Sequence, residues 1–196
     1  MSNKVEIAPQ IGGTSMKIWK RFLALGLVTI ITAMMFVGCG SSDISEGVAK
    51  NDYPITINGV TLNSQPTGVA VLSQNIADVI LTGGFEATLK AKSEDCTQED
   101  LSILPNLTID DVQEMKNLGV TLVLVDAAPT EQQTAALEAQ GIQVLAISPA
   151  KSRDDCKRLY REVGSAMVGG NTGYTKGEKA CDNVFYTLDD ITRLVP

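Results

Sequence analysis

Residues 119–147 read GVTLVLVDAAPTEQQTAALEAQGIQVLAI and contain a strand, a helix and a second strand in succession. The apolar runs at 121–125 and 142–147 are typical of buried strands. Between them, Pro129-Thr130 opens a helix over 130–140 that Gly141 ends. Two strands joined by a single helix form a right-handed crossover and lie parallel in one sheet.

The same alternation continues on both sides of this unit. Further strands are predicted at 69–72 and 87–91, helices at 76–83, 109–118 and 152–168, and one or two helical turns at 98–104. Asn75 is placed to cap the first of these helices. Single helices between strands indicate a parallel sheet that is covered on both faces. The predicted fold class is therefore α/β, a parallel sheet flanked by helices, with a long C-terminal helix.

Two segments differ from this alternation. Residues 53–62 alternate apolar and polar side chains around Asn58-Gly59, which predicts a β-hairpin. After the break at 169–171, residues 172–194 favour one helix of about 34 Å, although Gly173 and Gly177 weaken its first turns. Its apolar stripe consists of Ala180, Val184, Leu188 and Ile191. One small sheet cannot bury so long a stripe, so the helix is expected to be a spine between two lobes or an interface with another chain.

The N-terminal region has the pattern of an export signal. Residues 22–37 read FLALGLVTIITAMMFV and follow Lys17, Lys20 and Arg21. This apolar run is too short to span a membrane comfortably, which takes about 20 residues, and it is typical of a secretory signal peptide. The start codon is either Met1 or Met16.

The residues after the apolar run, Gly38-Cys39-Gly40, resemble the bacterial lipobox, although Phe36 stands where leucine is usual. The resemblance implies a signal peptide over 1–38, acylation of Cys39 and a flexible tether over 39–52. Two or more acyl chains would hold the protein on the extracytoplasmic face of the cell membrane. The alternative is a retained signal anchor with an incidental cysteine.

Charge excludes some partners of the mature chain. Lys4, Lys17, Lys20, Arg21 and Glu6 leave with the leader, so 12 of 16 basic and 22 of 23 acidic residues remain, a formal net charge of −10. An acidic surface disfavours nucleic acid, because binding there depends on neutralising phosphates. It also disfavours adhesion to anionic lipid, so membrane attachment is expected to depend on the acyl chains.

The sequence contains no histidine, which removes the commonest general base, the commonest metal ligand and every Ser-His or Cys-His pair. No catalytic residue, metal site or cofactor is predicted, and the chain is not expected to be an enzyme. Beyond Cys39 there are Cys96, Cys156 and Cys181, without C-x-x-C spacing. At least two are expected to be small buried hydrophobes. One disulfide could form in an oxidising compartment, but spacing does not select the pair.

Four segments, taken in order, resemble one family. They are VAVLSQNIADVI at 69–80 followed by Gly84, IDDVQEM at 109–115 followed by LVLV at 122–125, GIQV at 141–144, and GGN at 169–171. Together they resemble the substrate-binding lipoproteins of ABC importers, of the helical-backbone type that serves iron–siderophore, haem and cobalamin uptake. The resemblance covers roughly residues 53–196. It implies a class III periplasmic-binding-protein-like fold.

The resemblance also implies a domain organisation. Residues 53–168 correspond to the N-terminal α/β lobe and residues 169–196 to the spine helix. Family members carry a second lobe after this helix, whereas this sequence stops at Pro196. The expectation is therefore either a truncated gene product or a single functional lobe. A single lobe would need a partner chain or self-association to enclose a ligand.

Candidate ligand-binding residues follow the predicted strands, because ligands bind beyond the carboxyl ends of parallel strands. They are Ser73, Gln74 and Asn75, then Lys92, Ser93, Glu94 and Asp95, then Asp126 and Ala127. The alternative for each is ordinary capping and turn chemistry. Asp110 stands where the family has a glutamate that docks on an arginine of the permease. The alternative for Asp110 and Asp111 is that they complement the dipole of the following helix.

The predicted function is that of an extracytoplasmic solute-binding lipoprotein with ABC permease subunits as partners. The ligand, a small molecule or metal chelate, would be of the iron–siderophore, haem or cobalamin type. The candidate loops contain no aromatic residue, and Tyr160, Tyr174 and Tyr186 are expected to pack on the terminal helices. The lack of histidine disfavours the related zinc and manganese receptors. The alternative is a lipid-anchored protein-interaction module that uses the exposed C-terminal helix.

Overall fold

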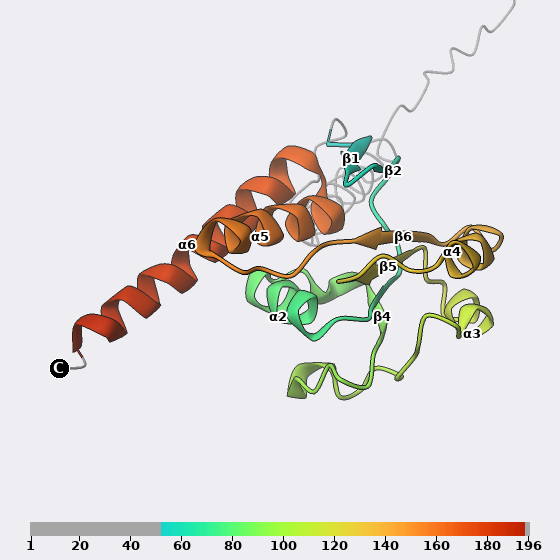
Figure 1. Ribbon diagram of the computed structural model, residues 1–196, viewed down its shortest axis with the longest axis horizontal. Helices are drawn as coiled ribbons and strands as arrows, with labels where there is room; N and C mark the ends of the chain where they lie inside the picture. The colour runs from blue at the N-terminus through green and yellow to red at the C-terminus, as the bar shows by residue number, and fades with distance from the viewer. Residues whose placement is uncertain (1–51, 195–196) are drawn as a thin grey trace, which may run out of the picture. The chain divides into compact units, whose positions relative to one another are not determined.

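A four-stranded parallel sheet forms the centre of residues 52–194, the part of the chain that the computed structural model describes (Figure 1). The strands lie in the order β4, β3, β5, β6, and every neighbouring pair is parallel. They are β3 (Val69–Val71), β4 (Leu89–Lys92), β5 (Leu122–Val125) and β6 (Gln143–Ala146). After β3 the chain turns to the β4 side, and after β5 to the β6 side. The topological switch point therefore lies between β3 and β5.

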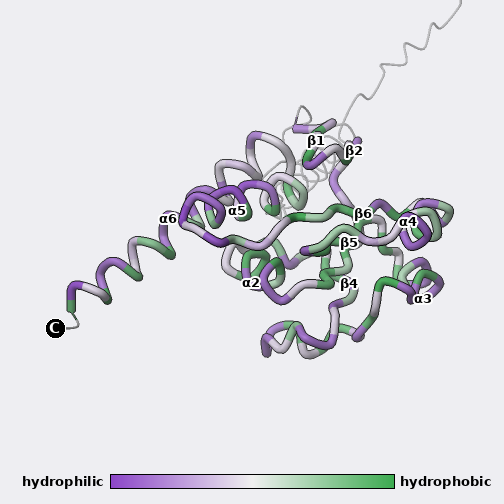
Figure 2. Tube along the Cα trace, in the orientation of Figure 1, coloured by the Kyte–Doolittle hydropathy of each residue, from purple (hydrophilic) through white to green (hydrophobic). Residues whose placement is uncertain are grey.

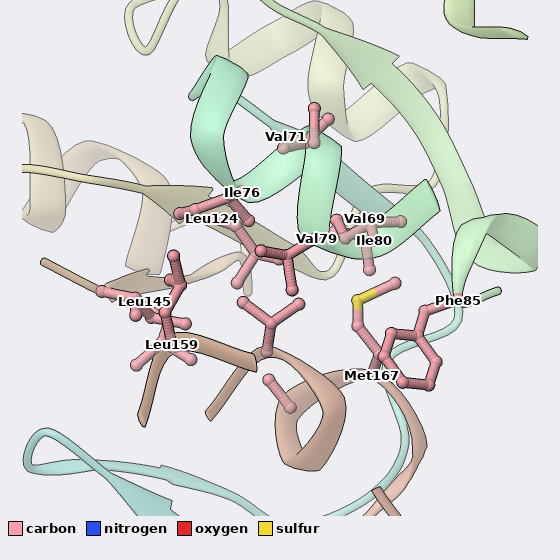
Figure 3. Packing of buried hydrophobic residues seen from close by; sticks show 14 of the residues in the cluster. Val69, Val71, Ile76, Val79, Ile80, Phe85, Leu124, Leu145, Leu159 and Met167 are labelled. Carbon is pink, nitrogen blue, oxygen red and sulfur yellow. The ribbon is translucent and has the colours of Figure 1, made fainter. Parts of the chain in front are cut away.

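Helices cover both faces of this sheet, which confirms the predicted α/β class. They are α2 (Gln74–Gly83), α3 (Val112–Asn117), α4 (Glu131–Glu138), α5 (Arg153–Val168) and α6 (Gly170–Leu194), with short 3-10 turns η1 (Glu86–Thr88) and η2 (Glu99–Leu101). In β5, Leu122 and Leu124 point into the core between the sheet and helices α2 and α5. Val123 and Val125 point to the opposite face, into the core between the sheet and helices α3 and α4. Figure 3 shows the first of these cores. In Figure 2 hydrophobic residues run along the strands, whereas much of α5 is hydrophilic.

The predicted hairpin is present. Strands β1 (Ile55–Ile57) and β2 (Val60–Leu62) pair antiparallel. Their turn residues Asn58 and Gly59 have φ angles of 49° and 83°, the positive values that a two-residue hairpin turn requires. The Asn58 side chain also donates a hydrogen bond of 3.0 Å to the carbonyl of Ala146, which fastens the turn to the end of β6.

Three sequence-based expectations need correction. The helix predicted over 109–118 begins only at Val112, because the Asp111 carboxylate accepts hydrogen bonds from the backbone and hydroxyl of Thr108 and closes a turn there. The strand predicted over 87–91 begins at Leu89, because η1 precedes it. Asn75 does not cap α2, because Ser73 occupies the capping position.

The long C-terminal helix forms as predicted. Its glycines are needed where α6 packs closely against α5. A Cβ atom on Gly173 would lie 2.0 Å from the carbonyl oxygen of Gly164 in α5, and one on Gly177 would lie 2.1 Å from that of Tyr160. No larger side chain fits between the two backbones. The glycines that weaken the isolated helix are therefore what brings α6 against α5.

A distant residue caps the start of this helix. The backbone N–H groups of Asn171 and Thr172 donate to the carboxylate of Asp52 at 3.3 Å each, and that of Gly170 donates to the Asp52 carbonyl at 2.9 Å. A carboxylate at a helix N-terminus satisfies unpaired donors and complements the helix dipole. Asp52 thus fixes the position from which α6 departs.

The last turns of α6 extend past α5 (Figure 1). Ala180 and Val184 are half-buried, and four larger side chains beyond them are exposed: Tyr186 (71%), Leu188 (48%), Ile191 (52%) and Leu194 (81%). The expectation that the sheet cannot bury the whole stripe is confirmed. Tyr160 is buried as expected, but the expectation for Tyr186 is wrong, because the helix has left the core at that point.

No helix within residues 52–194 is long and apolar enough to cross a membrane. The predicted signal peptide over 1–38, the lipidation of Cys39 and nearly all of the tether over 39–52 lie outside the described residues.

Candidate ligand-binding edge of the sheet

Ser73 and Asp126 meet at the carboxyl ends of β3 and β5, the two strands that flank the switch point. The Ser73 hydroxyl donates a hydrogen bond of 3.0 Å to Asp126 Oδ2 and accepts one of 3.4 Å from the backbone N–H of Ile76. Ser73 is buried, whereas Asp126 is partly exposed. A carboxylate with one oxygen held by the protein and access to solvent is suited to accept hydrogen bonds from a ligand at this edge.

Lys92 and Ser93 form the neighbouring part of the edge, at the end of β4. The Lys92 side chain is buried, and its ammonium donates to Asn106 Oδ1 at 2.7 Å and to the Ser93 carbonyl at 3.4 Å. The backbone of Lys92 also pairs with Asn106 in a parallel bridge. Ser93 shares a hydrogen bond of 3.2 Å with the thiol of Cys96. Lys92 therefore holds the returning loop against the strand end, which is a structural task.

The remaining candidates are exposed side chains of the same edge. They are Gln74, Asn75, Glu94, Asp95 and Ala127. The Gln74 carbonyl accepts a hydrogen bond of 3.3 Å from Gln98, whose amide also donates to Asp78 at 2.6 Å. These contacts connect the loop after β4 to the first turn of α2. All three predicted loops thus lie along one edge of the sheet. Among the described hydrogen bonds, only the one from Ser73 to Asp126 joins candidates from two different loops. That any of these residues contacts a ligand stays a prediction.

One exposed residue of this edge was not identified from the sequence. Ile103, 89% exposed, lies in the segment that leaves β4 at Lys92 and returns to it at Asn106. An isoleucine between Ser102 and Leu104, in a loop without apolar periodicity, carries no signal in the sequence, so only its exposure reveals it. It belongs to the same segment as Glu94 and Asp95 and adds an exposed apolar side chain that a bulky ligand could cover.

Asp110 lies at the start of α3, beside the start of α4. It is exposed, and its Oδ1 accepts a hydrogen bond of 3.0 Å from the side chain of Gln133 in α4. It lines a pocket of about 260 Å³ together with Ile109, Val112, Thr130, Gln132, Gln133 and Ala136. Asp111 behaves differently, because the backbone and hydroxyl of Thr108 donate to it and lower the pKa of its carboxyl. A cationic side chain could reach Asp110, whereas Asp111 is engaged within its own turn.

A larger pocket, of about 360 Å³, lies elsewhere. It is bounded by the hairpin and by α5 and α6, and the candidate residues of the sheet edge do not line it. Its charged residues are already paired: Arg158 with Glu162 at 2.9 Å, and Arg161 with Glu178. Strand-end geometry therefore favours the sheet edge over this pocket. Among the described side chains, no cluster of three or more cysteine or acidic residues could hold a metal ion.

Comparison with known proteins gives a fold and no closer relative. No family model matches the sequence, and no curated protein does. Solved structures match. One is a possible iron-binding (periplasmic solute-binding) protein from Staphylococcus epidermidis, at 15% identity and a TM-score of 0.53, covering 68% of this chain and 53% of that one.

Two further solved structures are similar. A periplasmic heme-binding protein from Pseudomonas aeruginosa matches at 14% identity and a TM-score of 0.53, covering 64% of this chain and 45% of that one. The heme-binding protein HmuT matches at 17% identity and a TM-score of 0.55, covering 70% and 46%. The chain spans about half the length of the solved proteins that it matches. The predicted resemblance to periplasmic binding proteins is thus confirmed for the fold.

Proposed function

We propose that this chain is an extracytoplasmic solute-binding protein of an ABC import system. The observation that carries the proposal is the Ser73–Asp126 hydrogen bond at the switch point of a sheet with the fold of periplasmic binding proteins. Open α/β sheets bind ligands at this place. No residue is assigned a catalytic role, because the edge offers hydrogen-bond acceptors and an apolar side chain for binding.

The ligand class follows from the edge and from what the similar proteins bind. Those proteins are described as iron-binding and heme-binding. We assign to this chain a ligand of the iron–siderophore, haem or cobalamin type. The acidic loop at Glu94 and Asp95 favours ligands whose facing groups are neutral or cationic. The exposed side chain of Ile103 would cover an apolar part of the ligand.

Thermal unfolding of the full chain with and without ligand tests this proposal. Hemin, cobalamin and a ferric hydroxamate siderophore are the probes, each at about 100 μM, because a ligand that binds the native state raises its stability by mass action. At least one probe should raise the midpoint. Asp126→Ala should weaken that rise. The matched control is Glu138→Ala, in the exposed last turn of α4, which should keep it. A chain that no probe stabilises would contradict solute binding.

The location is proposed through Cys39. Acylation there would anchor the protein to the extracytoplasmic face of the cell membrane. Cys39→Ala should release the protein from the membrane fraction and stop its labelling with radioactive palmitate. Cys96→Ala, at a cysteine of the described fold, should change neither. Unchanged membrane partitioning of Cys39→Ala would refute the anchor and leave solute binding to be judged by its own experiment.

A lipid-anchored protein-interaction module is the second candidate, and the exposed end of α6 favours it. Tyr186, Leu188, Ile191 and Leu194 place large apolar side chains in solvent, and such surfaces mark association sites. Size-exclusion chromatography with light scattering should then show self-association that Leu188→Gln combined with Ile191→Gln removes. A strictly monomeric chain would exclude this candidate.

A further inference from the structure

The contact between α5 and α6 follows a regular line of residues. Gly164 of α5 faces Gly173 of α6, and Tyr160 faces Gly177. The two helices therefore run antiparallel, and each step of four residues back in α5 corresponds to a step of four forward in α6. Residues four apart lie on the same face of a helix. The next step along this line leads to Cys156 in α5 and Cys181 in α6.

The surroundings of these two cysteines agree with that register. Cys181 is fully buried, and Cys156 is half-buried and packs against the same core cluster. The two thiols lie within hydrogen-bonding reach of each other. Beside them, Lys157 of α5 forms an ion pair of 2.9 Å with Asp182 of α6. The helices are therefore held together beside the cysteine pair by this ion pair and one turn away by the glycine contacts.

We propose that Cys156 and Cys181 are a disulfide-forming pair that links α5 to α6 when the protein is oxidised. A disulfide needs close Cα atoms and facing Cβ atoms. The glycine contacts one turn away bring the two backbones close, and the hydrogen bond between the thiols shows that the two side chains face each other. Cys96 is excluded as a partner, because it lies beyond the end of β4, where its thiol contacts Ser93 and donates to the carbonyl of Val71 at 3.8 Å. All three cysteines are free thiols in the present structure.

The reaction needs an oxidant of the disulfide class, R–S–S–R. The thiolate of Cys156, the more accessible of the two, attacks one sulfur, forms a mixed disulfide and releases the first R–S⁻. The thiolate of Cys181 then attacks the sulfur of Cys156, forms the Cys156–Cys181 bond and releases the second R–S⁻. The protein loses two electrons and two protons, and the oxidant becomes two R–SH. Burial, and then the neighbouring Cys156, raises the pKa of Cys181 to about 12, so Cys181 is mostly protonated and reacts second, after the more accessible Cys156.

The bond would fix the part of α6 from which the exposed end departs. Cys181 lies just before the turns that carry Tyr186, Leu188 and Leu194. Its loop would close about 25 residues, a length for which a disulfide stabilises the native state appreciably. Formation in cells depends on the extracytoplasmic location proposed above, because that compartment is oxidising. Formation in the purified protein does not.

Peptide mapping of the purified full chain tests the pair. The folded protein is treated with oxidised glutathione, remaining thiols are alkylated, and trypsin is added without reductant. The expected product joins peptide 154–157 (DDCK) to peptide 180–193 (ACDNVFYTLDDITR). Oxidation should also raise the thermal midpoint by about 5–10 °C. Cys156→Ser should lose both effects, and Cys96→Ser should keep both.

Two results would overturn the inference. One is a cross-link that joins peptide 93–116, which contains Cys96, to either helix. The other is full alkylation of Cys156 and Cys181 after oxidation. Neither result bears on solute binding, which the ligand titrations decide separately. Alkylation in intact cells then distinguishes the compartment: a pair that is cross-linked in the purified chain but reduced in cells refutes the extracytoplasmic location and leaves the pair itself established.

Discussion

Ser73 and Asp126, 53 residues apart in the sequence, are joined by a hydrogen bond of 3.0 Å across the ends of β3 and β5. The same Ser73 hydroxyl accepts from the N–H of Ile76 and so caps α2. One side chain thus positions a helix start and orients a carboxylate of the neighbouring strand end. This double use explains why serine, with a donor and acceptor on one atom, suits the position.

Ser73→Ala should destabilise the fold by about 1–2 kcal/mol, because it removes the cap of α2 and a buried hydrogen bond. Urea unfolding of the variant and the wild type measures the difference. Asn75→Ala is the control: Asn75 is exposed, and its loss should change stability by less than about 0.5 kcal/mol. Equal costs for the two substitutions would show that Ser73 does not act as the cap.

Gly173→Ala should destabilise the protein by about 2 kcal/mol or more. Helix propensity alone predicts the opposite sign, because alanine in a helix is about 1 kcal/mol better than glycine. The added Cβ would lie 2.0 Å from the Gly164 carbonyl oxygen, so α5 and α6 would have to separate. Lys179→Ala, on the exposed side of α6, should have little effect. A stabilised Gly173→Ala would refute the close helix contact.

Asp52 should make stability depend on pH in the acid range. Hydrogen bonds from Thr172 and Asn171 lower the pKa of its carboxyl below the ordinary value. A lowered folded-state pKa contributes stability that is fully present above about pH 4, the unfolded value, and is lost as pH falls through the folded one. Asp52→Asn should therefore unfold at lower urea than the wild type between pH 5 and 7. The difference should shrink below pH 4, and a constant difference down to pH 2 would contradict the assignment.

Asp110→Lys should impair docking to the importer without impairing the fold. The residue is exposed, so stability should change by less than about 0.5 kcal/mol. Stimulation of the importer's ATPase in proteoliposomes should fall at least tenfold, because the cation would face the permease arginine. Glu114→Lys, an exposed acid further along α3, is the matched control and should retain stimulation. Equal stimulation by the two variants would remove Asp110 from the docking surface.

The elements that the sequence predicts well are those with local signals. The apolar runs of β3, β5 and β6, and Asn58-Gly59 of the hairpin, specify their structure within a few residues. The misjudged features depend on distant partners. Gly173 is unfavourable until Gly164 lies against it. The late start of α3 at Val112 depends on which side chain accepts from Thr108, and no periodic pattern encodes that choice.

The same difference between local signals and distant contacts applies to the candidate ligand-binding edge of the sheet. Its position at the strand ends is predictable from topology, so the three loops were identified from sequence. Three features of the edge are not predictable in this way, because each depends on how the folded chain packs around the residue: the hydrogen bond between Ser73 and Asp126, the burial of Lys92 and the exposure of Ile103. The cysteine pair likewise becomes visible only once the register of α5 and α6 is known.

The carboxylate of Asp52 receives the N–H of Asn171, a residue 119 positions later in the chain. A ribosome completes the acceptor long before it completes the donor, so this contact cannot form until the chain has been synthesised through Asn171. Contacts of such long sequence separation slow folding, because the intervening loop must close first. The start of α6 is therefore fixed at Asp52 only late, after the strands of the sheet have been made.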